Sequence, residues 1–192
     1  MAGRADQLQL AHLTALTQLL LQDYGHPRCM LAPAEQLPPN LQTLHLYHGG
    51  DSAGHNDGSD GSLQPLLALS QLQSFELRMH CGAPPASELA ALSSISSLAE
   101  VKLVYLWHDL NAGHMMAPHL CAPLTEAAAD VAASAWLTLP MKSLHWISYS
   151  MPAAVVQLAG ALQGLTSLQL STNCEDADDG LVPAQLAAML QR

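Results

Sequence analysis

The chain is poor in the residues from which most charged and aromatic binding sites are built. Only 4% of its 192 residues are aromatic, so its core must be built mainly from Leu, Ala, Val and Met. It has six Lys and Arg against 16 Asp and Glu, which gives a net charge of −10. Because nucleic acids and anionic membrane surfaces are both bound by clustered basic residues, this balance argues against either as a partner.

Paired cysteines and long hydrophobic runs are also missing. The four cysteines are far apart and form no CxxC pair; they are Cys29, Cys81, Cys121 and Cys174. Such spacing in a chain of this length predicts reduced thiols rather than a disulfide framework. No run approaches the roughly 18 apolar residues that span a bilayer, and the N-terminus has no unbroken apolar signal segment. We therefore expect a cytoplasmic or otherwise intracellular protein without a membrane segment.

The common catalytic and phosphate-binding motifs are absent as well. The chain has no GxSxG, no GxxxxGK[ST] and no GxGxxG. No Cys–His–Asn order stands out among its ten histidines. These absences predict a protein that is not an enzyme and that needs no cofactor.

What the chain has in abundance is apolar residues, 49% of the total, and these follow a repeated pattern. In six hexapeptides the apolar positions are separated by polar or charged residues, with Leu20 and Ala99 as the exceptions, and such alternation is typical of half-buried strands. They are LTQLLL (16–21), LQTLHL (41–46), LQSFEL (72–77), LAEVKL (98–103), MKSLHW (141–146) and LTSLQL (165–170). Their last residues are separated by 25, 31, 26, 43 and 24 positions, so the repeat is irregular.

The segments between these hexapeptides predict helices. They are rich in Ala and Leu, with apolar residues at helical spacing and Pro near several starts. The expected helices cover residues 85–95, 122–137, 151–162 and 182–190. Strands and helices therefore alternate along the chain. Trp146, at a strand-core position, is expected to fill the core.

The pattern resembles the leucine-rich repeat family, whose core reads LxxLxLxxN/C. The best match is Leu165, Leu168, Leu170 and Asn173. The resemblance implies one domain over residues 1–192, an α/β solenoid of about six irregular repeats. It also implies a parallel sheet on the concave face, helices on the convex face, and an Asn that bonds backbone groups at the turn. Loop insertions are expected at about 49–62 and 107–121.

In such a sheet, successive side chains alternate faces, so the residues flanking the repeated leucines would form rows on the concave face. Tyr, Arg and Met, which are enriched in protein interfaces, occur in these rows. The predicted function is a non-enzymatic interaction module that presents this face to a protein partner. Its candidate binding residues are His45, Tyr47, Glu76, Arg78, Lys102, Tyr105 and His145. The alternative is that residues such as Glu76 and Lys102 merely pair across adjacent strands on a solvated sheet.

Two loops and the chain ends suggest further readings. The Asp-rich loop 49–61 does not have the spacing of a calcium-binding loop, and a solvated insertion is expected there. The alternative function is a metal-dependent enzyme or metal-binding protein that uses the His, Asp and Cys residues of 108–121, although their spacing fits no zinc motif. We expect no metal. Neither end carries a compelling cap, which predicts end-to-end self-association or a piece of a longer array.

Overall fold

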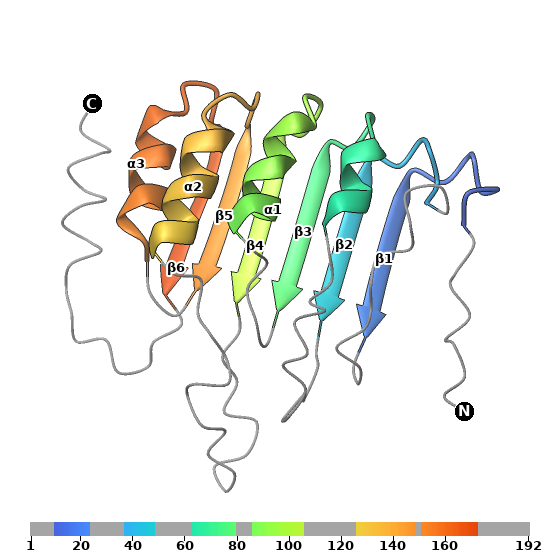
Figure 1. The fold of residues 1–192 in the computed structure, drawn as a ribbon, viewed down its shortest axis with the longest axis horizontal. Helices are drawn as coiled ribbons and strands as arrows, with labels where there is room; N and C mark the ends of the chain where they lie inside the picture. Colours follow the sequence, from blue (N-terminus) through green and yellow to red (C-terminus); the bar gives the residue numbers. More distant parts are fainter. Residues whose placement is uncertain are drawn as a thin grey trace, which may run out of the picture.

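The computed structural model describes residues 10–23, 37–48, 63–79, 86–105, 126–148 and 151–172. Six parallel strands form a single open sheet, in which they lie in the order of the sequence, β1-β2-β3-β4-β5-β6. The described helices cover one face of this sheet (Figure 1). The architecture is therefore α/β, as the alternation of the two patterns predicted, and its sheet is parallel, as the resemblance implied.

The strands are all six residues long. They are β1 (Gln18–Asp23), β2 (Thr43–His48), β3 (Ser74–Met79), β4 (Glu100–Tyr105), β5 (Ser143–Ser148) and β6 (Ser167–Thr172). The helical elements are η2 (Gln64–Ala68), α1 (Ala86–Ala91), η3 (Leu92–Ser94), α2 (Glu126–Trp136) and α3 (Ala153–Ala161). Each strand begins at the third residue of one of the six hexapeptides, so all six predicted strands are confirmed.

The register of the sheet also follows the repeat. Equivalent positions pair across every step, as Leu46 does with Leu77 and Leu77 with Leu103. Such registry is expected because a shift by one residue would move each strand's apolar residues to the opposite face.

The apolar residues of the strands point toward the helices. Leu44, Phe75, Val101 and Leu144 form one row across the sheet and are at most 1% exposed. Removing a side chain of this size from water stabilises the fold by about 1.5–3 kcal/mol. Trp146 is 1% exposed and lies among this core, as predicted.

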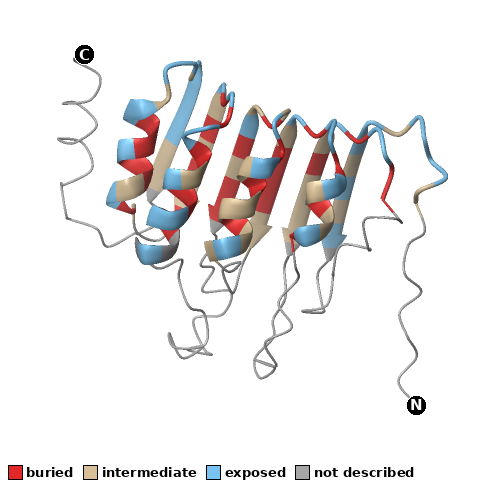
Figure 2. Ribbon diagram, turned by 45° about the horizontal axis from the view of Figure 1, so that its top comes forward, coloured by how far each residue is buried: buried red, intermediate tan, exposed pale blue. Residues whose placement is uncertain are grey.

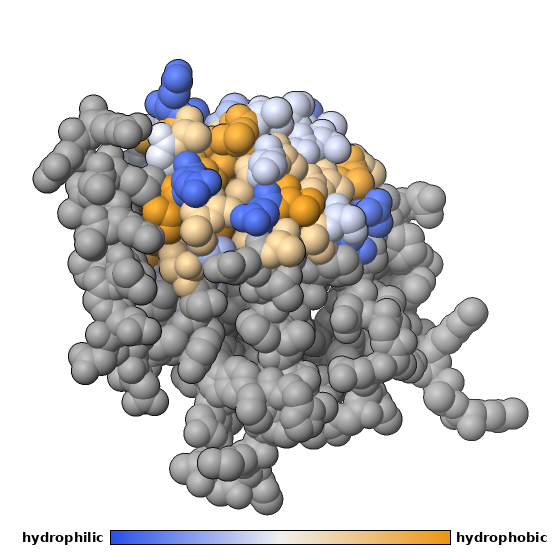
Figure 3. All heavy atoms as spheres, turned by 60° about the vertical axis from the view of Figure 1, so that its left-hand side comes forward, coloured by the Kyte–Doolittle hydropathy of each residue, from blue (hydrophilic) through white to orange (hydrophobic). Residues whose placement is uncertain are grey.

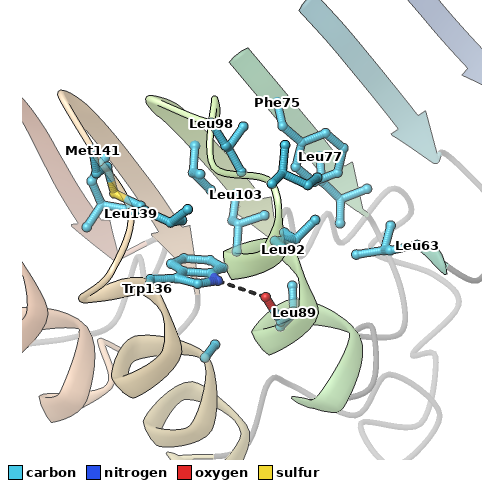
Figure 4. Close-up of a cluster of buried hydrophobic side chains, with 14 of the residues drawn as sticks. Leu63, Phe75, Leu77, Leu89, Leu92, Leu98, Leu103, Trp136, Leu139 and Met141 are labelled. Atoms are coloured by element: carbon cyan, nitrogen blue, oxygen red, sulfur yellow. Dashed lines mark hydrogen bonds between the residues drawn. The ribbon is translucent and has the colours of Figure 1, made fainter. Parts of the chain in front are cut away.

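The helices are attached to one another as well as to the sheet. α2 packs between α1 and α3. Its last residue, Trp136, is fully buried and donates a hydrogen bond of 2.7 Å from Nε1 to the carbonyl oxygen of Leu89 in α1 (Figure 4). Its ring also lies 6.2 Å from that of Trp146, measured between centroids. This residue therefore joins two helices and the sheet.

Two consecutive i to i+3 turns, built on apolar residues three positions apart, precede β1, β3 and β4. Before β3, the N–H of Leu69 bonds the carbonyl of Leu66, and the N–H of Leu72 bonds that of Leu69. The same two bonds recur before β4 and before β1, where they join Leu10, Leu13 and Leu16. The spacing of three residues turns the chain sharply and keeps the apolar side chains on one side.

The helices predicted at 85–95, 122–137 and 151–162 are confirmed as α1 with η3, α2 and α3. The 3-10 helix η2 was not predicted. The helix expected at 182–190, the insertions at 49–62 and 107–121, and Asn173 with its predicted turn lie outside the described residues.

Candidate protein-binding face

The face of the sheet opposite the described helices carries the alternate residues of each strand. We call it the helix-free face. It is made of three rows that run across the strands. The first row is Gln18, Thr43, Ser74, Glu100, Ser143 and Ser167; the central row is Leu20, His45, Glu76, Lys102, His145 and Gln169; the third is Gln22, Tyr47, Arg78, Val104, Ile147 and Ser171.

The centre of this face is a carboxylate held by three basic side chains. Only 7% of the Glu76 side chain is exposed. Its Oε1 accepts from Arg78 Nε at 2.6 Å and lies 3.0 Å from Lys102 Nζ. Its Oε2 is 2.7 Å from His45 Nδ1. An ionised carboxylate can only accept, so the proton of this last bond is on His45 Nδ1.

The ionisation of this cluster follows from its contacts. Burial alone raises the pKa of the Glu76 carboxyl, but hydrogen bonds and positive charge from Arg78 and Lys102 outweigh this effect. The pKa of Glu76 therefore lies below its ordinary value of 4.5. The hydrogen bond to Glu76 raises the pKa of Arg78 above its ordinary value. The carboxylate and the guanidinium are thus both charged at neutral pH.

An aromatic residue completes the cluster. The guanidinium carbon of Arg78 lies 4.7 Å from the centroid of the Tyr47 ring, which is within the range of a cation–π contact. The His45 ring meets the same ring edge-on, with centroids 6.4 Å apart. Arg78 is thereby held by a carboxylate on its own strand, β3, and by a ring on the adjacent strand β2.

The structure brings together five of the seven residues predicted to bind a partner. His45, Tyr47, Glu76, Arg78 and Lys102 form the cluster just described. His145 lies on the same face in β5, where its Nε2 is 3.2 Å from Ser167 Oγ in β6. Tyr105 is the last residue of β4, and its side chain lies outside the described part.

The next row along the strands, whose described side chains include Met79 and Ser148, lies on the helix side of the sheet, although Met had been expected among the residues of the concave face. Side chains alternate along a strand, so the residue after the third row points back toward the helices. Met79, in this row, packs against the core. Ser148, also in this row, is 6% exposed and accepts a hydrogen bond from Trp146 Nε1 at 3.0 Å.

Two features of the face were not predicted. Val104 is only 4% exposed although it lies on the helix-free face. Ser167 was not considered as a partner of His145. The alternative to partner binding predicted that Glu76 and Lys102 pair across adjacent strands, and the structure confirms this pair as an ion pair.

The competing site in residues 108–121 lies outside the described residues. Within the described ranges, no three His, Cys, Asp or Glu side chains gather in a way that could hold a metal ion. In the same part of the chain, no helix has the length and apolar character needed to cross a bilayer.

Comparison with family models and with curated proteins found no match for this chain.

Proposed function

We propose that this protein is a non-enzymatic interaction module of the leucine-rich repeat type, which binds a protein partner through the concave, helix-free face of an α/β solenoid. The supporting observation is the ordered cluster around Glu76. A carboxylate that is largely buried holds Arg78, Lys102 and His45 in fixed positions, with Tyr47 stacked on Arg78.

Preordering of this kind favours binding, because long basic side chains lose less freedom when a partner arrives. Arg and Tyr are also the residues on which interface energy is often concentrated. The position of the described helices is a second argument. Parallel sheets are usually covered on both faces, whereas the described helices cover only one here.

The chemistry of the face indicates the kind of segment that would bind. The Glu76 cluster pairs two basic side chains, those of Arg78 and Lys102, with one carboxylate, within a chain whose net charge is −10. Half-buried Tyr47 and Ile147 and the 53% exposed Leu20 add apolar surface. We expect a peptide segment with a carboxylate beside an apolar side chain.

Reversing the charge of Arg78 is a poor test, because it would place two carboxylates together and destabilise the fold. Tyr47→Ala and Ile147→Asp leave the Glu76 ion pairs in place. The matched control is Val131→Asp, since Val131 is 48% exposed on α2 and lies on the other side of the sheet.

The experiment is selection from a random peptide display library on the wild-type protein, followed by affinity measurement on all variants. We expect enriched peptides that carry an acidic and an apolar residue, and roughly tenfold weaker binding to each helix-free-face variant. Val131→Asp should bind as the wild type does. If Val131→Asp weakens binding as much as Tyr47→Ala, or if no peptide is enriched, the proposal is wrong.

A further inference from the structure

The two edge strands of the sheet carry complementary halves of one backbone contact. Between consecutive strands, one carbonyl oxygen accepts two successive N–H groups from the start of the next strand. Thr17 accepts in this way from Gln42 and Thr43, and Lys142 accepts from Thr166 and Ser167, at 2.8–3.0 Å. The same paired-amide link occurs at all five steps of the sheet, with the carbonyls of Gln42, Gln73 and Ala99 accepting at the other three.

The next carbonyl in this series belongs to Thr166, at the start of β6. The preceding pair of N–H groups belongs to Thr17 and Gln18, at the start of β1. Among the described strands, β1 and β6 each pair on one side only. The outward edge of β6 therefore offers the acceptor, the Thr166 carbonyl, and the outward edge of β1 offers the two N–H donors that such a carbonyl binds.

The apolar side chains are incomplete at the same two edges. Leu144 in β5 is fully buried, whereas Leu168, its neighbour in β6, is 36% exposed. At the other end, Leu13 is 38% exposed. Leu69 and Ile95, which hold the equivalent position in the i to i+3 turns before β3 and β4, are at most 3% exposed. Figure 2 shows the contrast between the buried middle strands and the exposed β6, and Figure 3 shows apolar patches on the surface when the α3 and β6 end is turned forward.

We propose that the β6 edge of one copy pairs with the β1 edge of a second copy, head to tail and in parallel. The contact repeats the step that joins strands within the chain. Thr166 accepts from the Thr17 and Gln18 N–H groups of the second copy, and Leu168 and Leu170 are covered by its Leu19 and Leu21. The two surfaces differ, so the association does not close at two copies.

This inference concerns the sheet edges and does not depend on binding at the helix-free face. It is tested first on the wild-type protein by sedimentation over a wide range of concentrations. We expect the average mass to rise with concentration and to pass beyond the dimer. A protein that stays monomeric throughout, or stops at the dimer, overturns the proposal.

Two variants block one edge each. Gln18→Pro removes an outward N–H at the first residue of an edge strand, a position where Pro is tolerated; Gln18→Ala is its control, because it keeps the N–H. Leu168→Lys places a charge in the apolar contact at the other edge. We expect Gln18→Pro and Leu168→Lys each to need roughly tenfold or higher concentration to associate, whereas Gln18→Ala associates as the wild type does.

Mixing the two blocked variants separates a head-to-tail contact from a symmetric one. Gln18→Pro keeps a working β6 edge and Leu168→Lys keeps a working β1 edge. An equal mixture should therefore form dimers and nothing larger. Self-association of Gln18→Pro alone would indicate pairing of β6 with β6, and of Leu168→Lys alone pairing of β1 with β1; either result contradicts the proposal. Circular dichroism confirms that each variant is folded, and the wild-type measurement decides if one is not.

Discussion

Glu76 shows how a single residue can organise a face of this protein. A carboxylate that is 7% exposed would be unfavourable if it were unpaired, since desolvation opposes its charge. Arg78, Lys102 and His45 supply the compensating contacts. The same contacts hold those three side chains in place, so the stabilisation of one buried charge also orders the surface around it.

Replacing Glu76 with Gln tests this arrangement. Glu76→Gln keeps the shape and removes the charge, and we expect it to lower the free energy of unfolding at pH 7 by about 1.5–3 kcal/mol, the usual contribution of hydrogen bonds to charged groups. Urea unfolding measures the change. Glu100→Gln is the matched control, because Glu100 is an exposed carboxylate on the same face, and it should change stability little.

The pKa of Glu76 gives this loss a pH dependence. Its folded pKa is below the ordinary value of 4.5, so its contribution is fully present above about pH 4.5 and is lost as the pH falls through the folded pKa. Wild type and Glu76→Gln should therefore differ at pH 7 and converge in strong acid. A difference that is the same at both pH values would show that the charge of Glu76 is not responsible.

At the scale of elements, α2 depends on small residues. Ala129 and Ala132 are fully buried and Ala133 is 6% exposed, on a helix that packs between α1 and α3. Alanine allows close approach because it ends at Cβ. This explains why the connecting segments are rich in Ala as well as Leu: the helices must fit beside one another over a sheet whose strands are closely spaced.

We expect Ala132→Leu to lower the free energy of unfolding by about 1–3 kcal/mol, because added methylene groups cannot be accommodated in a packed core. Ala127→Leu adds the same atoms at an exposed position of the same helix, and should be nearly neutral. Thermal unfolding of the two variants compares them directly. Equal melting temperatures would mean that α2 is not closely packed against its neighbours.

For the whole molecule, burial decreases from the middle strands toward the edges. Leu144 and Leu168 are the same residue type, paired across β5 and β6, yet one is fully buried and the other is 36% exposed. Position in the stack, and not residue type, decides how much each contributes to stability.

Replacing each of these two leucines with Ala measures how much the contribution to stability falls from the middle strands to the edge. Leu144→Ala should cost about 2–5 kcal/mol, as is usual for a large-to-small change in a core. Leu168→Ala should cost less than half as much, because its side chain is still partly in water. The comparison is made by urea unfolding of dilute protein, so that association does not contribute. Similar losses would show that the β6 end is packed as well as the middle.

The local pattern was sufficient to predict the strands and most of the helices. Alternation in each hexapeptide determines which residues are buried, and the repeat of that alternation determines the register, because equivalent apolar residues must lie side by side. η2 was missed because the turns of LQPLLALSQL (63–72) are set by i to i+3 bonds, which place leucines three residues apart rather than at the spacing of an amphipathic α-helix.

The candidate site was only partly predictable. Alternation along each strand is enough to predict which residues form the three rows of the helix-free face. The repeat of that alternation then places Glu76 beside Lys102 in the neighbouring strand. Met79 and Ser148 lie on the other side of the sheet, because one further residue along a strand reverses the direction of the side chain.

The sequence by itself determined the α/β class, six strands, their register and the residues of the core, since these depend on periodicity along the chain. Only the tertiary structure decided that Glu76 is buried beneath Arg78, Lys102 and His45, that Trp136 joins α1 to α2, and that Leu168 is left exposed while Leu144 is not. These features depend on which side chains meet across strands and on where the stack ends. Residues with identical local patterns differ in both, so no local pattern can distinguish them.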